Sequence, residues 1–249
     1  MLILLPPSET KHAGGAGPRL DVAHLSLPSL APQRETVVDA LVALSADEDE
    51  AARVLKLGPT QRGEVAVNAQ LRMSPTMAAV DRYTGVLYDA LDAASLGALS
   101  RRWIGRHVLV HSAPFGPVGG LDPIPAYRLG ASTSIPALPA LRRVWADAVT
   151  TALAEAAPRF VLDLRSEAYA ALGPVPDTVA SRYVRVVSEG PDGAVRALNH
   201  FNKHAKGELV RRLAVERPRL GSAASFLRWA DAAGLRVREN AAGELELFA

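Results

Sequence analysis

Short apolar runs, each closed by Pro, Gly or polar residues, restrict this chain to folds that bury strands inside a layered core. Residues 1–5 are apolar and are stopped by Pro6-Pro7, and residues 106–112 and 159–164 form two further runs. None approaches the roughly 18 residues that a membrane-spanning helix needs, so each run predicts a buried strand. The opening run also lacks the basic start of a signal peptide. We therefore expect a cytoplasmic protein without a membrane segment.

Helical patterns and two hairpins make up much of the remaining sequence. We expect helices at residues 32–57 (two helices), 76–92, 95–103, 140–156, 202–215 and 223–232. We expect strand pairs at residues 183–187 and 194–198, joined by a turn at 190–193, and at 235–238 and 245–248. Because strands and helices do not alternate strictly, the pattern predicts an α+β fold, a single compact domain over residues 1–249 with a mixed β-sheet flanked by helices.

Composition excludes several kinds of chemistry. The chain has 249 residues, of which 49% are hydrophobic, so a sizeable core is expected. It contains no cysteine. Disulfides, thiolate zinc sites and a cysteine nucleophile are therefore excluded.

Positive charge is concentrated in the C-terminal part of the chain. The formal net charge is +2, yet residues 101–249 carry +6 and residues 196–219 alone carry +5. A solvated helix face is the simpler explanation of charge alone, but such a segment also attracts phosphates. We expect it to form a basic cleft that binds duplex or branched DNA, or a small anionic nucleotide-like ligand.

A polar loop follows the strand at residues 106–112. Ser112 stands at the strand end and is followed by a Gly-rich segment with Asp122, Tyr127 and Arg128. Ligands of sheet proteins commonly bind at strand ends, so this loop predicts one rim of a binding site. The alternative is a structural loop in which Arg128 pairs with Asp122.

A second polar segment follows the strand at residues 159–164. Ser166, Glu167 and Tyr169 lie where this strand runs into a helix. Ser166 either caps that helix with its hydroxyl or joins the other two side chains at the mouth of the same cleft.

The helix at residues 202–215 combines an apolar stripe with cations. Its apolar residues recur at every fourth position and should face the core. Gly207 is unfavourable in a helix interior and predicts a close approach by another helix or by a ligand. The cations expected on the flank away from the stripe are Lys203, Lys206 and Arg211.

Residues 46–68 resemble a helix-hairpin-helix, in which loop amides bind a DNA phosphate. Arg53, Lys56 and Arg62 lie within this segment. The usual Gly-x-Gly hairpin is missing, so loop chemistry supports the interpretation only weakly.

Two pairs of histidines are four residues apart: His107 with His111, and His200 with His204. Neither pair has a third ligand at a recognised spacing. We therefore expect no metal and no cofactor.

Several short motifs follow one another along nearly the whole chain. They are Met1–Leu4 with Pro7 and Thr10; Gly85, Tyr88 and Leu91; Ser112, Phe115, Gly116, Leu121, Asp122, Tyr127, Arg128 and Leu129; Trp145 and Asp147; Leu164, Ser166, Glu167 and Tyr169; Lys203, Ala205, Lys206, Gly207 and Arg211; and Gly243–Leu245. Together these motifs resemble the YaaA peroxide-stress family.

The resemblance implies a cytosolic protein that limits oxidative damage under peroxide stress, with a compact fold and a positively charged cleft that binds DNA. This chain departs from the family pattern at two places. Glu9 replaces a family lysine, so Lys11 would have to reach any ligand from a shifted backbone. Gly119-Gly120 replaces an Arg-Pro pair, which removes one positive charge.

Two classes of function stay open. In the first, a monomeric protein binds DNA through backbone phosphates. In the second, an enzyme acts on a nucleotide- or nucleobase-like substrate in the same cleft, with Glu167 or Asp122 as general base and Tyr169 or Tyr127 as proton donor. Arg128 or Lys203 would then hold the anion.

Overall fold

A computed structural model describes residues 1–189, 195–197 and 200–249. The strands of its main sheet are β1 (Leu2–Leu5), β3 (Val108–Ser112), β4 (Gly116–Gly119), β6 (Val161–Asp163), β7 (Ser181–Glu189), β8 (Val195–Ala197), β9 (Val237–Glu239) and β10 (Leu245–Phe248). They follow the order β4-β3-β1-β6-β7-β10-β9, with β8 paired to β7. The pairings from β3 through β10 in this order are parallel, and β4, β8 and β9 join antiparallel. The sheet is therefore mixed, as predicted.

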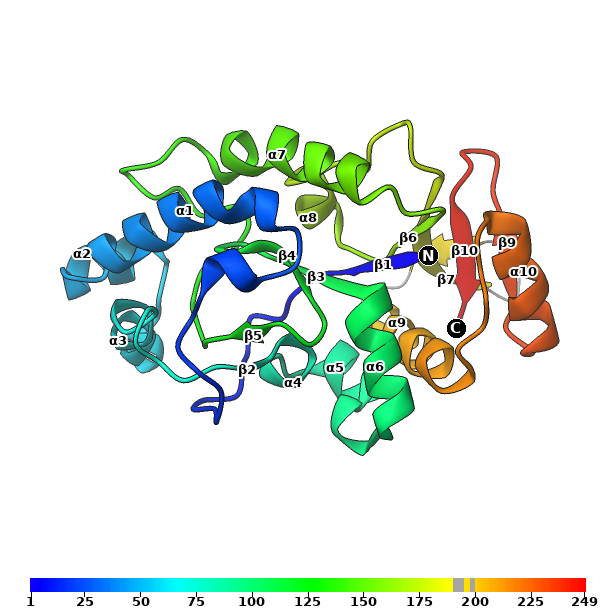
Figure 1. The fold of residues 1–249 in the computed structure, drawn as a ribbon, viewed down its shortest axis with the longest axis horizontal. Coiled ribbons are helices and arrows are strands. Elements are labelled where there is room, and N and C mark those ends of the chain that lie inside the picture. Colours follow the sequence, from blue (N-terminus) through cyan, green and yellow to red (C-terminus); the bar gives the residue numbers. More distant parts are fainter. Residues whose placement is uncertain (190–194, 198–199) are drawn as a thin grey trace.

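Helices cover both sides of this sheet (Figure 1). They are α1 (Ala31–Leu44), α2 (Glu48–Val54), α3 (Gly63–Ala69), α4 (Ala79–Arg82), α5 (Val86–Leu91), α6 (Ala98–His107), α7 (Leu141–Ala156), α8 (Glu167–Ala171), α9 (His200–Glu216) and α10 (Ala223–Ala232). In Figure 1, α7 and α8 lie above β1, whereas α5, α6 and α9 lie below it and α10 packs beside β9. None of the described helices is long and apolar enough to cross a lipid bilayer.

Most predicted elements are confirmed, with two differences. The single helix expected at residues 76–92 is wrong: a short strand, β2 (Met77–Ala78), precedes α4, and Gly85 separates α4 from α5 at a φ of +92°. The irregular stretch at residues 113–140 contains β4 and also β5 (Pro123–Ile124), which pairs with β2. The predicted turn at residues 190–193 lies outside the described residues.

Two fully buried arginines hold the long loops together. Arg34 and Arg82 are both fully buried, and each donates hydrogen bonds to main-chain carbonyl oxygens of several loop segments. The acceptors of Arg34 are Val22, Leu25, Ser26, Phe115 and Pro117, and those of Arg82 are His12, Gly14, Pro75 and Ile124. A guanidinium has five N–H donors, so one buried side chain satisfies carbonyls from several loop segments at once.

The helix α9 crosses α5 at very close range. A Cβ atom added at Gly207 would lie 2.2 Å from the carbonyl oxygen of Leu87 and 2.8 Å from Cβ of Ala90. The predicted close approach at Gly207 is therefore confirmed, and its partner is a helix. Ala205, Leu209 and Leu213 of the expected apolar stripe are buried, and the side chain of Phe201 lies outside the described set.

Replacing Gly207 by Ala should push α9 away from α5. Overpacking of this kind typically costs about 1–3 kcal/mol in the free energy of unfolding. Urea unfolding of the Gly207→Ala variant measures this cost. The matched control is Gly63→Ala in α3, where an added Cβ meets no atom within 4 Å. Equal stability of the two variants would contradict the proposed tight crossing.

Candidate functional site

An open cleft of about 900 Å³ lies at the carboxyl ends of β1 and β6. Its walls come from segments distant in sequence, which are the loop after β1, the turn before α5, the turn into α8, the middle of β7 and the start of α9. The lining residues are Pro6–Thr10, Thr84–Tyr88, Leu164, Ser166–Tyr169, Tyr183–Val186, Asn202, Lys203 and Lys206. This placement follows the tendency of ligands to bind beyond the carboxyl ends of parallel strands.

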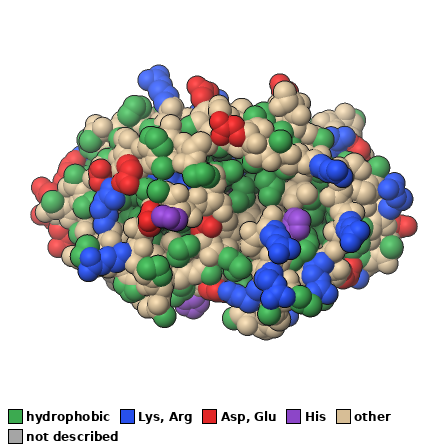
Figure 2. Space-filling view, viewed as in Figure 1, with side chains coloured by type: hydrophobic (Ala, Val, Ile, Leu, Met, Phe, Trp, Pro, Cys, Tyr) green, Lys and Arg blue, Asp and Glu red, His purple; other side chains and the backbone are tan. Residues whose placement is uncertain are grey.

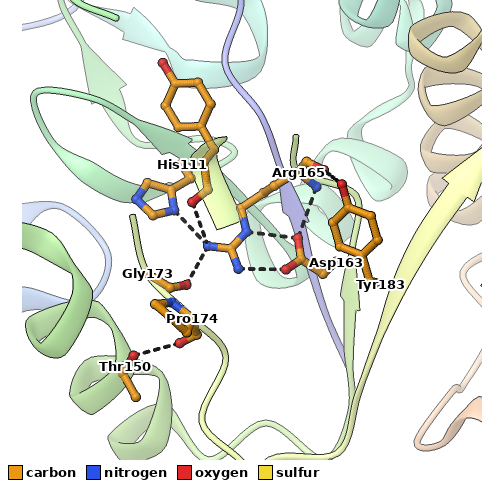
Figure 3. Close-up of polar contacts among 8 residues, drawn as sticks. His111, Thr150, Asp163, Arg165, Gly173, Pro174 and Tyr183 are labelled. Carbon is orange, nitrogen blue, oxygen red and sulfur yellow. Dashed lines mark hydrogen bonds and ion pairs between the residues drawn. The ribbon is translucent and has the colours of Figure 1, made fainter. Parts of the chain in front are cut away.

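A buried ion pair supports the turn between β6 and α8 (Figure 3). Arg165 is fully buried, and its Nε and Nη2 donate to the two carboxylate oxygens of Asp163 at 2.9 and 2.7 Å. Its Nη1 donates to Nδ1 of His111 at 2.9 Å and to the carbonyl oxygen of Gly173 at 2.8 Å. The hydroxyl of Tyr183 closes the network by donating to the carbonyl oxygen of Arg165 at 2.8 Å.

This network determines the state of His111. A guanidinium has no acceptor, so Nδ1 of His111 must accept and its proton must be on Nε2. Burial, together with the charge of Arg165, lowers the pKa of His111 well below its usual value, so the ring is neutral. Its Nε2 is buried and has no hydrogen-bond partner among the described residues.

The turn into α8 brings three of the predicted site residues to the cleft. Ser166 occupies the N-cap position of α8, but its hydroxyl makes no capping hydrogen bond, so it is open to the cleft instead. Glu167 accepts a hydrogen bond from Nη1 of Arg185 at 3.0 Å. Burial raises the pKa of Tyr169, which is therefore a neutral phenol at physiological pH.

The helix α9 contributes two lysines that differ sharply in environment. Lys203 is exposed at the mouth, whereas Lys206 is only 5% exposed. Lys206 was expected on the flank of α9 away from the apolar stripe; this flank is buried at Lys206, because α9 packs against α5 and β7, and Lys206 lines the cleft. Burial lowers the pKa of Lys206 to about 8, although the carboxylate of Asp163 opposes this effect. Its Nζ lies 5.6 Å from the ring centre of Tyr183.

Lys206 makes no hydrogen bond or ion pair within the part of the chain that the structure describes. Among the described residues, Oδ1 of the neighbouring Asn202 is buried without a partner. Lys203 and Lys206 are three residues apart, and Asn202 and Lys206 are four apart, so all three lie on one face of α9. Polar groups buried without partners are uncommon in native structures and indicate a missing ligand or water.

Lys11 lies behind the loop after β1 and does not line the cleft. Its Nζ donates to the carbonyl oxygens of Ser8 and Glu9 at 3.0 and 3.2 Å and lies 4.0 Å from the ring centre of Tyr127. Burial, reinforced by the charge of Arg128, lowers the pKa of Lys11 to about 7. In this position Lys11 shapes the loop that forms one wall.

Arg128 and Tyr127 flank the same loop. Arg128 lies 3.4 Å from the carboxylate of Glu9, so its expected pairing with Asp122 is wrong. Tyr127 is buried, with its hydroxyl 2.8 Å from that of Tyr83. These two residues support the cleft from behind.

Ser112 and Asp122 are not brought to the cleft. The hydroxyl of Ser112 is fully buried, accepts from the backbone N–H of Phe115 at 3.0 Å and donates to the carbonyl of Gly116 at 3.2 Å, which closes the turn between β3 and β4. Asp122 accepts from the backbone N–H groups of Gly119 and Ser26 at 2.7 and 2.6 Å. The Ser112 hydroxyl is therefore satisfied within its own turn, and the Asp122 carboxylate is satisfied by the turn at Gly119 and by the distant segment at Ser26.

The remaining predicted arginines also have structural partners. Arg211 donates to the carbonyl oxygens of Leu91 and Asp92 at 3.0 and 2.9 Å, which fastens α9 to the end of α5. The segment at residues 46–68 does form two helices, α2 and α3, but Arg53 pairs with Glu50, and Arg62 pairs with Glu48 and Asp49. Lys56 lies in the turn after α2 at a φ of +55°.

Sequence reasoning missed two cleft residues on β7. Tyr183 and Arg185 both line the cleft, and Arg185 pairs with Glu244 at 2.5 Å as well as with Glu167. The two residues are two apart on one strand, so their side chains lie on the same face of the sheet. This spacing was the feature of the sequence that could have identified them. The cleft lining therefore carries both signs of charge: Arg185, Lys203 and Lys206 against Glu9 and Glu167.

The pair of His107 and His111 does not form a metal site, and the side chain of His200, which would pair with His204, lies outside the described residues. Nδ1 of His107 lies 2.8 Å from the carbonyl oxygen of Met1, whereas His111 belongs to the network of Arg165. Within residues 1–189, 195–197 and 200–249, no three His, Asp or Glu side chains are grouped closely enough to hold a metal ion.

Comparison with known proteins extends over almost the entire chain. A family model described as peroxide stress protein YaaA matches residues 1–241. A UPF0246 protein of Corynebacterium glutamicum is 46% identical over 246 residues, which cover 96% of each chain. A UPF0246 protein of Streptomyces coelicolor is 46% identical over 216 residues, covering 86% of this chain and 82% of the relative, and one of Bordetella petrii is 27% identical over 227 residues, covering 87% and 86%.

The buried ammonium of Lys206 should make stability depend on pH. In the unfolded chain this lysine keeps its proton up to about pH 10.5, whereas in the folded protein it releases the proton near pH 8. The unfolded state therefore binds more protons between these values, and the free energy of unfolding should rise with pH by up to roughly 3 kcal/mol. Above pH 10 the buried tyrosines, whose pKa values are raised, oppose the rise.

Urea unfolding between pH 7 and pH 10 measures this slope. Lys206→Met should reduce the slope and stabilise the protein at pH 7, while Lys11 maintains part of the rise because its pKa is also lowered. Lys203→Met, which replaces an exposed lysine one turn earlier in the same helix, is the control and should leave the slope unchanged. An unaltered slope in Lys206→Met would show that Lys206 is fully hydrated.

Proposed function

Because this chain belongs to the peroxide stress protein YaaA family, we propose that it acts in the response to peroxide by binding a nucleotide-like anion in the cleft at the carboxyl ends of β1 and β6. The observation that carries this proposal is Lys206, a buried ammonium that faces the cleft without a described partner. Burial of an unpaired charge is costly, and a bound anion supplies the missing partner.

The chemistry of α9 fits one end of a nucleotide. Lys203 and Lys206 place two ammonium groups on one helix face, as a phosphate requires. Asn202 adds an amide oxygen without a partner among the described residues, which can accept from an N–H or hydroxyl group of the same ligand. The ring of Tyr183 offers a surface for a base or a sugar.

Cleft size supports a small ligand over a double helix. The volume of about 900 Å³ lies within the range of roughly 300–1,000 Å³ typical of small-molecule sites. A single groove of B-DNA is already about 12 Å wide, so an intact duplex could touch only the rim of such a cleft.

Adenosine monophosphate should bind this cleft, and adenosine should bind more weakly. Hydrogen bonds to charged groups contribute about 1.5–3 kcal/mol, so Lys206→Met and Lys203→Ala should each weaken binding of the monophosphate roughly 10-fold or more. Isothermal titration calorimetry with wild type and variants measures this. Arg228→Ala on α10, outside the cleft lining, is the matched control. The proposal fails if the wild type binds no monophosphate at millimolar concentration, or if Lys206→Met binds it equally well.

A second candidate function, binding of duplex DNA, is favoured by a surface away from the cleft. Arg106, Arg159, Arg217 and Arg219 are exposed around His107, and we call them the arginine patch. None of the four has an ion-pairing partner among the residues described. Figure 2 shows cations gathered over the region of α6, whereas carboxylates collect at the opposite end near α2. Such a surface attracts DNA phosphates.

Gel-shift titration at two salt concentrations separates the two candidates. If the arginine patch binds duplex DNA, the triple variant Arg159→Ala, Arg217→Ala, Arg219→Ala should weaken binding and lower the slope of log affinity against log salt by about 0.9 for each lost phosphate contact. Lys206→Met should leave DNA binding unchanged. DNA binding that is insensitive to salt, or equal in the triple variant, would dispose of this candidate.

A further inference from the structure

This chain uses lysine very sparingly. Of its 28 Lys and Arg residues only four are lysines, namely Lys11, Lys56, Lys203 and Lys206. Arginine stays protonated in proteins and suits permanent ion pairs, whereas a buried lysine readily shifts its pKa and then serves as a base or nucleophile. A site that needs only positive charge is served by arginine, which this chain uses elsewhere even in full burial, as at Arg34, Arg82 and Arg165.

Lys206 is the lysine whose surroundings suit a nucleophile. Lys11 is half-buried, but its Nζ already donates to two carbonyl oxygens and the residue is not part of the cleft lining. Lys56 and Lys203 are exposed to solvent, and Lys56 does not line the cleft. Lys206 combines burial, access to a cleft of ligand size and the lack of a described acceptor, so its amine can approach a bound carbonyl carbon.

We propose that Lys206 forms an imine with an aldehyde-bearing phosphate compound held in this cleft, with Lys203 binding the phosphate. This proposal rests on the proposed function, because it uses the same cleft and the same anion-binding face of α9. It adds a covalent step and a substrate class, a small phosphorylated aldehyde. The lowered pKa of Lys206, about 8, means that a useful fraction of the amine is neutral at physiological pH.

The step needs no oxidant and no reductant. The neutral amine nitrogen of Lys206 adds to the carbonyl carbon, and a proton moves from nitrogen to the former carbonyl oxygen to give a carbinolamine. The C–O bond then breaks, the hydroxyl leaves as water after taking a proton, and a C=N bond remains. One amine and one aldehyde thus give one imine and one water. Glu167, a carboxylate in the cleft lining, is placed to relay the protons.

Reductive trapping tests the proposal directly. Pyridoxal 5′-phosphate serves as the probe, because it carries both an aldehyde and a phosphate and its imine absorbs visible light. Borohydride converts the imine to a stable amine, and mass spectrometry of the peptides then covers all four lysines. Lys206 should be labelled at least 10-fold faster than Lys56, adenosine monophosphate should slow its labelling, and the rate should level off above about pH 8.

The variants Lys206→Arg and Lys56→Arg form a matched pair that conserves charge, and Lys56 lies outside the cleft lining. Lys206→Arg should abolish the rapid labelling, whereas Lys56→Arg should retain it. Labelling spread over Lys56 and Lys203, or equally rapid in Lys206→Arg, overturns the proposal. If Lys206→Arg does not fold, the test is whether adenosine monophosphate slows the labelling of Lys206 in the wild type. Equal labelling of all four lysines, unaffected by adenosine monophosphate, contradicts the proposal.

Unphosphorylated pyridoxal distinguishes failure of this inference from failure of the proposed function. If pyridoxal labels Lys206 as fast as pyridoxal 5′-phosphate does, Lys206 is a nucleophile but the cleft has no anion site. If adenosine monophosphate binds but no adduct is trapped at Lys206, the cleft has an anion site but Lys206 is not a nucleophile.

Discussion

The buried pair of Arg165 and Asp163 is the interaction on which the cleft depends. It joins the end of β6 to β3 through His111 and to the end of α8 through the carbonyl of Gly173. A buried pair of this kind gives little net stability, but loss of one partner typically costs about 3–5 kcal/mol because the other charge stays buried. Its role is therefore geometric: it holds the turn that presents Ser166, Glu167 and Tyr169. The carboxylate of Asp163 also raises the pKa of Lys206. The buried pair and the wall of the cleft formed by α9 are therefore electrostatically linked.

The order of strands and helices was largely predictable, because it depends on periodicity. Apolar runs became β1, β3 and β6, and the helices α7 and α10 match the predicted ranges closely. The errors lie where main-chain conformation is set by distant contacts. The break at Gly85 depends on the neighbouring loop, since an added Cβ there would lie 3.3 Å from Oγ of Ser8. No local pattern records such a contact.

The candidate site was predicted only in part, and the reason is the same. The turn at residues 166–169 and the lysines of α9 do meet in the cleft. Ser112 and Asp122 do not, although their residue types at a strand end are equally suited to bind a ligand. A hydroxyl or carboxylate that satisfies local backbone N–H groups looks identical, in sequence, to one that awaits a ligand. The burial of Lys206 could not be predicted from the sequence either, because it depends on how α9 packs against β7 and α5.

The crossing of α9 and α5 has a mechanical consequence for recognition. The turn before α5 packs against the loop after β1 at Gly85, and the Tyr88 hydroxyl donates a hydrogen bond to the carbonyl oxygen of Pro6. On the other side, α9 packs closely against α5 at Gly207. Three walls of the cleft are therefore packed directly against one another. A receptor built this way is preorganised and loses little conformational entropy when it is filled, so its selectivity comes from shape and charge that exist beforehand.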